Sequence, residues 1–178
     1  MHDERMGMRA LRAALGQFAT GVTVVTARAP DGTNVGVTAS SFNSVSLEPP
    51  LVLWSLARSA RSLAAFRGAG HFAVNVLAAD QIPLSNRFAT QRDDKFSGVE
   101  CVDGLGGAPL LAGCAARFQC RRAFEYDGGD HLIFVGEVLA FDCDGSPSLL
   151  FHRGRYALPA PHPAARTAVQ QAGATARI

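Results

Sequence analysis

The sequence has little of what marks several large classes of proteins. Lys and Arg exceed Asp and Glu by only two charges, so a broad basic surface for nucleic acid is not expected. No apolar run approaches the roughly 20 residues that a membrane-spanning helix requires. The charged N-terminus, residues 1–9, is not followed by an apolar signal region, so we expect a cytoplasmic protein that binds neither nucleic acid nor membrane.

Cysteine is sparse and scattered. The four cysteines, Cys101, Cys114, Cys120 and Cys143, form no C-x-x-C pair, and no His-x-x-x-His motif accompanies them. This spacing argues against a zinc site, and we expect no bound metal. Scattered cysteines of this kind are typical of reduced, partly buried thiols in a cytosolic protein.

Glycine-rich phosphate loops are also missing. Residues 104–107 read G-L-G-G, but they lack the lysine of a P-loop and the spacing of a dinucleotide fingerprint. We therefore interpret them as a turn.

What remains is the composition of an ordinary globular domain. The chain has 178 residues, of which 48% are hydrophobic and 18% charged, which suits one domain with a proper core. Many short strand-like segments and few helical ones predict a mainly β protein closed into a barrel, because closure removes exposed strand edges. We expect this domain over residues 8–156, and a mobile Ala- and Pro-rich tail over residues 157–178.

Local patterns place several elements of this barrel. The helical spacing of Met8, Leu11 and Leu15 predicts an amphipathic helix packed on the barrel or on a sheet. Asp80 is the expected N-cap of a second helix over residues 80–88.

The strand patterns are equally local. The β-branched residues 22–26 and the turn at Gly32 predict a hairpin with a strand beginning at Val35. Asn75 interrupts the apolar strand 71–77, and it is either hydrogen-bonded in the interior or turned toward a ligand. The charge run at residues 92–95 is typical of a solvated face.

The stretch from Asn34 to Ser62 organises the chain. Apolar strands at its start and end flank a polar crossing rich in Ser and Thr, and Arg58-Ser59-Ala60-Arg61-Ser62 follows. A planar cofactor with polar edges and a phosphate needs parts of this kind. The alternative interpretation is a Ser-rich loop between two strands, followed by a solvated basic helix start.

The end of this stretch predicts an anion site. A short helix beginning near Ser62 would present unsatisfied amide groups and the positive end of its dipole. The guanidinium of Arg61 and the hydroxyl of Ser62 could then bind a phosphate. Ser62 could equally be a simple N-cap, and the two roles are compatible.

Eight short motifs, taken in order, resemble the flavin reductase family, the short reductase components of two-component flavin monooxygenases. They are L-G-Q-F-A-T-G-V-T-V-V-T (15–26), V-T-A-S-S-F (37–42), S-L-E-P-P-L-V (46–52), S-A-R-S (59–62), F-A-V-N-V-L (72–77), R-F-A with D-K-F (87–89 and 94–96), G-D-H (129–131) and R-G-R-Y (153–156). Each motif is weak alone, and their order across most of the chain carries the resemblance.

The resemblance implies an FMN-binding split β-barrel that forms a homodimer and holds FMN or FAD at the dimer cleft. It places the flavin against Asn34, Val35, Gly36, Val37, Thr38, Ser40, Ser41, Trp54, Ser55, Leu56, Phe88 and Ala89, with the phosphate at Ala60, Arg61 and Ser62. It places the nicotinamide nucleotide beside the catalytic His131 and beside His152, Arg153, Gly154 and Arg155.

The implied activity is reduction of flavin by NADH or NADPH, with the reduced flavin passing to a separate monooxygenase. His131 would position and polarise the nicotinamide, and its alternative role is that of a hydrogen-bonded histidine in a tight turn. Arg155 stands where relatives also have an acidic residue, and this extra cation could accept the 2′-phosphate of NADPH. Two other functions stay open: a non-catalytic flavin carrier or redox sensor, and a barrel oxidase that retains its flavin.

Overall fold

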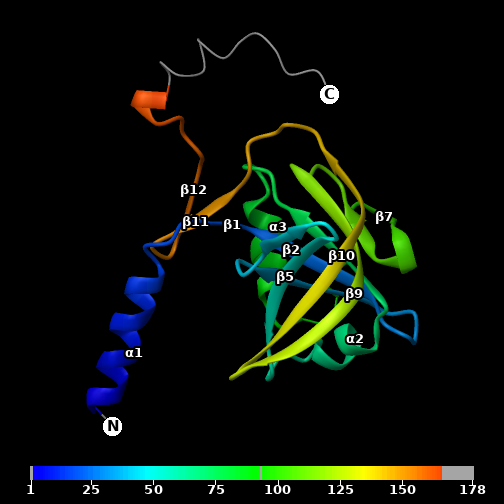
Figure 1. Cartoon of the computed structure of the whole chain (residues 1–178), viewed down its shortest axis with the longest axis horizontal. Helices are drawn as coiled ribbons and strands as arrows, with labels where there is room; N and C mark the ends of the chain where they lie inside the picture. Colours follow the sequence, from blue (N-terminus) through cyan, green and yellow to red (C-terminus); the bar gives the residue numbers. More distant parts are fainter. Residues whose placement is uncertain (1, 93, 166–178) are drawn as a thin grey trace.

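The structure, a computed structural model, describes residues 2–92 and 94–165 (Figure 1). Most of the tail expected over residues 157–178 therefore lies outside the described residues. The helices are α1 (His2–Leu15), α2 (Leu63–Gly68) and α3 (Ile82–Ala89), with single 3₁₀ turns η1 (Leu105–Gly107) and η2 (Pro163–Ala165). The strands are β1 (Thr20–Gly21), β2 (Thr23–Arg28), β3 (Asn34–Ala39), β4 (Asn43–Leu47), β5 (Pro50–Ala57), β6 (His71–Val76), β7 (Cys101–Asp103), β8 (Pro109–Leu111), β9 (Ala116–Gly128), β10 (His131–Cys143), β11 (Leu150–His152) and β12 (Arg155–Ala157).

Seven antiparallel strands in the order β3-β2-β6-β9-β10-β5-β4 form a strongly curved sheet, so the prediction of a mainly β split barrel is confirmed. The predicted hairpin is present as β2 and β3, and Gly32 in its turn has a φ of +85°. Just beyond the end of β3, the Ser41 side chain contacts the backbone of Ser55 in β5. The barrel is thus split between its edge strands β3 and β4, and a side chain bridges the two halves.

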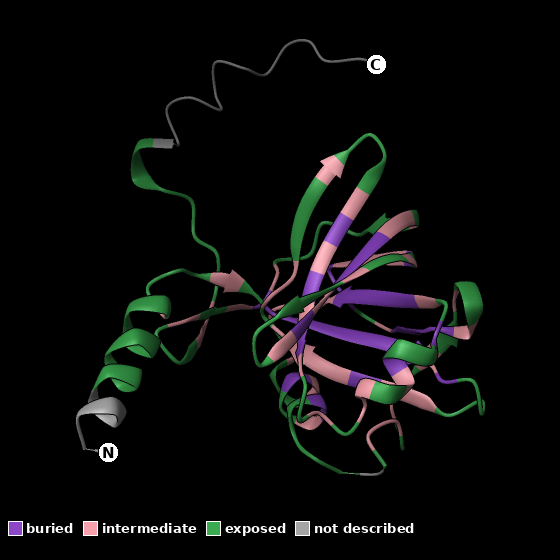
Figure 2. Ribbon diagram, turned by 60° about the horizontal axis from the view of Figure 1, so that its bottom comes forward, coloured by how far each residue is buried: buried purple, intermediate pink, exposed green. Residues whose placement is uncertain are grey.

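The barrel core forms around Trp54. Along β5 the buried residues are Val52, Trp54 and Leu56, because alternate side chains of a strand point to opposite faces. The Trp54 ring stacks on Phe134 at a centroid distance of 4.9 Å and meets the ring of Phe66 edge-on at 4.9 Å. Figure 2 shows these buried segments running through the middle of the barrel.

A second core lies outside the barrel, under α3. Its buried residues are Val22, Val24, Leu77, Phe88, Leu111, Cys114 and Leu149. Strand β2 is therefore covered on both faces, which explains why its β-branched run does not alternate with polar residues.

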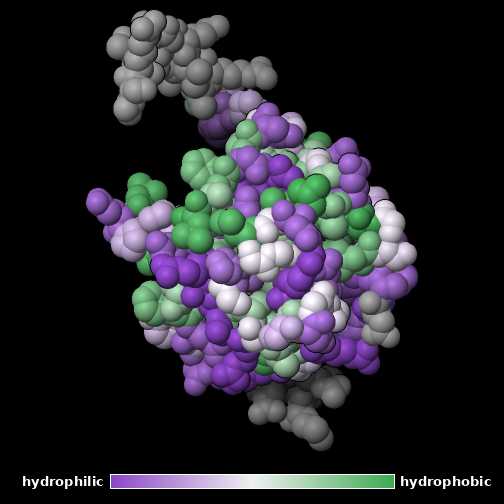
Figure 3. All heavy atoms as spheres, turned by 90° about the vertical axis from the view of Figure 1, so that its right-hand side faces the viewer, coloured by the Kyte–Doolittle hydropathy of each residue, from purple (hydrophilic) through white to green (hydrophobic). Residues whose placement is uncertain are grey.

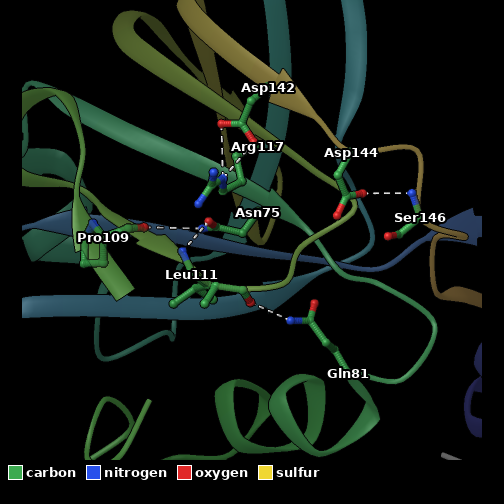
Figure 4. Close-up of polar contacts among 9 residues, drawn as sticks. Asn75, Gln81, Pro109, Leu111, Arg117, Asp142, Asp144 and Ser146 are labelled. Carbon is green, nitrogen blue, oxygen red and sulfur yellow. Dashed lines mark hydrogen bonds and ion pairs between the residues drawn. The ribbon is translucent and has the colours of Figure 1, made fainter. Parts of the chain in front are cut away.

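Asn75 is buried and hydrogen-bonded in the interior, so the first of the two interpretations of this residue is correct. Its side-chain amide donates to the carbonyl of Val24 at 3.0 Å and to the hydroxyl of Thr26 at 3.1 Å. Its carbonyl oxygen accepts from the backbone N–H of Leu111 at 2.9 Å (Figure 4). These bonds connect β6 to β2 and β8, so Asn75 stabilises the barrel rather than contacting a ligand.

The N-terminal helix is present, but its apolar face is covered neither by the barrel nor by a sheet, so that part of the prediction was wrong. Helix α1 stands beside the small sheet β1-β11-β12 in an arm that extends away from the barrel (Figure 1). Met8, Leu11 and Leu15 are more than half exposed, and so is Phe18. Helical periodicity predicts an apolar face, but it does not specify what covers that face.

The barrel face turned away from this arm looks different. Hydrophilic and hydrophobic residues are interspersed on it (Figure 3), as on an ordinary protein surface.

The N-cap of α3 also differs from the prediction, since it is Gln81 rather than Asp80. Gln81 ties this turn to its surroundings by accepting from the N–H of Ala78 and donating to the carbonyl of Ala112. Among the described residues, no helix is both long and apolar enough to cross a membrane.

Candidate functional site

Two adjoining cavities lie along β3. The cationic cavity, of about 510 Å³, is lined by Thr33, Asn34, Val35, Gly36, Val37, Ala57, Ser59, Ala60, Arg61, Ser62, Phe88, Ala89, Thr90, Gln91, Arg92, Lys95 and Phe96. The His131 cavity, of about 570 Å³, is lined by Val37, Thr38, Ala39, Ser40, Ser41, Ser55, Leu56, Ala57, Ala60, Gly128, His131 and Ile133. They share Val37, Ala57 and Ala60 in their walls, so they lie next to each other. Each volume lies in the range of small-molecule sites, about 300–1,000 Å³.

The structure brings together residues that are far apart in the sequence. Every residue predicted from the resemblance to contact flavin lines one of these cavities, except Trp54. The predicted phosphate residues lie in the cationic cavity, and His131 lies in the other.

Trp54 is a correction. Its side chain is fully buried in the barrel core, and it lines neither cavity. Its ring packs among Phe66, Phe72 and Phe134 on the core face of β5, whereas its neighbour Ser55 points to the opposite face and lines the His131 cavity.

The four residues from His152 to Arg155 form a second departure. They lie in the turn between β11 and β12, where Arg153 has a φ of +52°. The backbone N–H of Arg153 donates to the carbonyl of Gly16, and its guanidinium donates to Gln17, each at 2.9 Å. These residues therefore belong to the arm, and within one chain they do not line the cavities that contain His131.

The cationic cavity has the composition of an anion site. Arg61, Arg92 and Lys95 line it together with several hydroxyl groups, and none of the described residues that line it is acidic. Ser62 occupies the N-cap position of α2, but its side chain makes no capping hydrogen bond. Its position at the cavity suits a ligand contact, whereas the predicted N-cap role is not realised through the hydroxyl.

Arg58 and Arg61 turn out to have different surroundings. Of these two arginines of the 58–62 segment, only Arg61 lines the cationic cavity. The guanidinium of Arg58 instead contacts the carboxylate of Asp127 and the carbonyl of Gly129.

Lys95 is the site residue that the sequence interpretation undervalued. The run at 92–95 was interpreted as solvated, and this holds for Arg92, which pairs with Asp94 on the surface. The amine of Lys95, however, is half-buried and donates to the carbonyls of Gly36 at 3.1 Å and Phe88 at 2.9 Å. This burial lowers the pKa of Lys95. The available signal was Phe96, whose ring packs edge-on against the buried Phe88 and draws the loop inward.

His131 is oriented by its neighbour in the sequence. Its Nδ1 lies 2.7 Å from Oδ1 of Asp130, and this hydrogen bond lowers the pKa of Asp130. A carboxylate can only accept, so Nδ1 carries the proton of the bond. Nε2 is then the ring nitrogen left for a ligand in the His131 cavity.

No set of three or more His, Cys, Asp or Glu side chains that could hold a metal ion occurs in residues 2–92 and 94–165. The donors of the site are guanidinium, amine, hydroxyl and imidazole groups. This set suits an anionic organic ligand with a polar edge.

Comparisons with known proteins agree with this site. Residues 15–158 match the family described as flavin reductase like domain. The chain is 52% identical over 149 residues to the FMN reductase (NADH) SmoA of Agrobacterium fabrum, covering 83% of this chain and 84% of that one. It is 44% identical over 153 residues to the reductase component of the flavin-dependent trigonelline monooxygenase of Acinetobacter baylyi, covering 86% of this chain but only 49%, about half, of that relative.

A solved structure extends the comparison to three dimensions. The NADH:FAD oxidoreductase SgcE6 of Streptomyces globisporus, in complex with NAD and FAD fragments, superposes with a TM-score of 0.81 at 41% identity. The match covers 86% of this chain and 93% of that one. At this identity the likeness extends beyond the fold to the sequence.

Proposed function

The chain belongs to the flavin reductase family, and we propose that it reduces FMN or FAD with NADH or NADPH and supplies the reduced flavin to a separate monooxygenase. The observation that carries this proposal is that the two cavities adjoin and share wall residues, with cations in one and the oriented His131 in the other. An elongated ligand with a phosphate and a planar ring requires both cavities.

The cationic cavity would hold the flavin phosphate. Arg61 and Ser62 present a guanidinium and a hydroxyl there, and the amine of Lys95 adds positive charge from the facing loop. Charge-assisted hydrogen bonds of this kind are about twice as strong as neutral ones.

The wall between the two cavities would hold the flavin ring. Val37, Ala57 and Ala60 are small apolar residues shared by both cavities, and they leave room for a flat ring against β3. Gly36 also lines the cationic cavity, and its missing side chain leaves room for the ring of Phe88 to pack against β3.

The bound cofactors supply the chemistry themselves, since a hydride passes from C4 of the nicotinamide to N5 of the flavin. The protein binds, orients and excludes water. His131, fixed by Asp130, would present Nε2 to a bound nicotinamide nucleotide and help to orient it. This step requires no acid, base or nucleophile from the chain.

A homodimer is part of the proposal. Helix α1 exposes Met8, Leu11 and Leu15 on an arm away from the barrel, and a contiguous exposed apolar face marks an interaction surface. A second copy that covers this arm would also bring the His152–Arg155 turn toward its partner. We place the protein in the cytoplasm, where nicotinamide nucleotides are available and the four free thiols stay reduced.

The proposal is tested by following oxidation of NADH and NADPH at the nicotinamide absorbance, with FMN, FAD or no flavin added. We expect turnover that depends on added flavin, and the fastest pair identifies both cofactors. Flavin that remains bound through desalting would favour an oxidase that retains its cofactor. Flavin binding without turnover for any pair would favour the carrier or sensor.

A further inference from the structure

The hairpin between β9 and β10 ends in an exposed turn beside the candidate site. Its two-residue turn is Gly129-Asp130, and Gly129 has a φ of +71°, as the first position of a type II′ turn requires. The side chains of Asp127 and Asp130 are 84% and 93% exposed. His131 follows this turn directly, so its place at the cavity depends on how the turn is held.

Arg58 holds the turn from the neighbouring strand. At the end of the β5–β10 pairing His131 lies opposite Ala57, and the next backbone N–H, that of Arg58, donates to the carbonyl of Asp130 at 2.9 Å. The Arg58 side chain then contacts two further residues of the turn. Its Nε donates to the carbonyl of Gly129 at 2.9 Å, and its Nη2 donates to Oδ1 of Asp127 at 2.5 Å.

Arg58 lies in the chain between two residues that line the cavities. Ala57, just before it, lines both cavities, and Ser59, just after it, lines the cationic cavity. Arg58 itself lines neither. One side chain therefore connects the turn that carries Arg61 to the turn that precedes His131.

We propose that Arg58 is a positioning residue for hydride transfer, which holds His131 at its cavity by tying the hairpin turn to the phosphate-binding turn. This inference rests on the proposed function. Because the guanidinium reaches two acceptors in different directions, a planar fork serves here better than the single amine of lysine. Removing it leaves the cavity walls intact but frees the hairpin end.

The kinetic test compares Arg58→Met with the unmodified protein, alone and in a His131→Ala background. We expect Arg58→Met to lower kcat/KM for the nicotinamide nucleotide by about threefold to tenfold, the size of a lost positioning contact, with the flavin dissociation constant unchanged within about twofold. In the His131→Ala background the same substitution should have no further effect, because Arg58 acts through His131. Arg58→Lys should lie between the two.

Arg67→Met is the matched control. Arg67 is also a partly exposed arginine, and it pairs with Glu125 on β9 at 3.0 Å, but it lines neither cavity. It should leave the kinetics unchanged. An equal loss for Arg58→Met in both backgrounds, or a loss as large for Arg67→Met, would overturn the inference.

A second measurement uses the flavin-free protein and needs no turnover. Amide hydrogen exchange at residues 127–131 should be faster in Arg58→Met and unchanged in Arg67→Met, because a local tether is lost. Unchanged exchange there would overturn the inference. Turnover by the unmodified protein with no effect of Arg58→Met would overturn this inference alone. Absence of flavin-dependent turnover in the unmodified protein would overturn the proposed function as well.

Discussion

The hydroxyl of Ser41 is hydrogen-bonded to both backbone groups of Ser55: it accepts from the N–H at 2.9 Å and donates to the carbonyl at 3.2 Å. The Ser41 side chain therefore takes the place of a backbone hydrogen-bonding partner for Ser55 and connects the end of β3 to β5. Ser41 was predicted from the resemblance as a flavin contact, and it does line the His131 cavity. Its hydrogen bonds give it a second, structural role, because they connect the two sides of the barrel where the sheet is open.

Ser41→Ala should therefore lower the free energy of unfolding by about 1–2 kcal/mol, because two partly buried backbone groups of Ser55 lose their partner. Urea unfolding followed by tryptophan fluorescence measures this directly, since Trp54 is the one tryptophan of the sequence and lies in the core. Ser44→Ala on the exposed β4 is the control, and it should change stability by less than about 0.5 kcal/mol. Equal stability of both variants would show that the Ser41 bridge contributes nothing.

Gly36→Ala should damage both the cavity and the core. A Cβ at this position would lie 2.5 Å from Cε1 of Phe88, whose ring is fully buried and cannot move aside. Overpacking of this kind costs about 1–3 kcal/mol, and any shift of β3 moves the wall of the cationic cavity. We expect a lower unfolding midpoint and a raised flavin dissociation constant. Gly70→Ala, where a Cβ meets no atom within 4 Å, should have neither effect; equal behaviour of the two variants would refute the predicted clash.

Arg61→Ala should raise the flavin dissociation constant by about tenfold or more, as expected for a lost charge-assisted hydrogen bond to phosphate. Arg67→Ala removes an exposed arginine that lines neither cavity, and it should leave flavin affinity unchanged. Flavin fluorescence titration at low and moderate salt measures both. If Arg61→Ala binds flavin as tightly as the unmodified protein, Arg61 does not belong to the phosphate site.

The cysteines should divide into two classes. Burial raises the pKa of Cys114 to about 11 and that of Cys120 to about 12, so both stay unreactive thiols at neutral pH. Titration with a thiol reagent should modify the partly exposed Cys101 and the exposed Cys143 in the native protein, and all four cysteines only after unfolding. Rapid native modification of all four would contradict the burial of Cys114 and Cys120.

The raised pKa values of Cys114 and Cys120 also predict how the stability of the protein changes with pH. Their pKa values are raised in the folded protein, whereas in the unfolded chain thiols ionise near pH 8.5. Unfolding therefore releases protons above that pH, and stability should fall as the pH rises from about 9 to 11. Cys120→Ala should weaken this dependence, although its cavity lowers stability at every pH. An unchanged slope would exclude Cys120 as a cause.

The fold was predictable where the pattern is local. The strand of the β-branched run, the turn at Gly32, the strand beginning near Val35 and the short helix beginning near Ser62 are all present, as β2, its turn, β3 and α2. The cavity lining followed from the resemblance, because the matching motifs are the segments that form the walls.

The features that could not be predicted are the direction in which a side chain points and the surface against which an element packs. The run from Leu51 to Leu56 is apolar except for Ser55, so its pattern did not show that Trp54 faces the core and Ser55 the cavity. Arg58 and Arg61 have similar sequence surroundings, and the contacts of Arg58 with the β9–β10 hairpin distinguish it from Arg61 only in three dimensions. The spacing of Leu11 and Leu15 indicated an apolar helix face, but it did not indicate which surface, if any, that face contacts.

The most direct test of the central claim is an anaerobic single turnover, in which flavin reduction and nicotinamide oxidation are followed together in the unmodified protein and in His131→Ala. We expect equimolar flavin reduction and nucleotide oxidation in the unmodified protein. In His131→Ala we expect hydride transfer slower by about tenfold or more, with flavin affinity changed by less than about twofold. Equal losses of hydride transfer and flavin affinity in His131→Ala would remove His131 from its assigned role. Tight flavin binding by the unmodified protein, with no reduction by either nucleotide, would contradict the assignment as a flavin reductase.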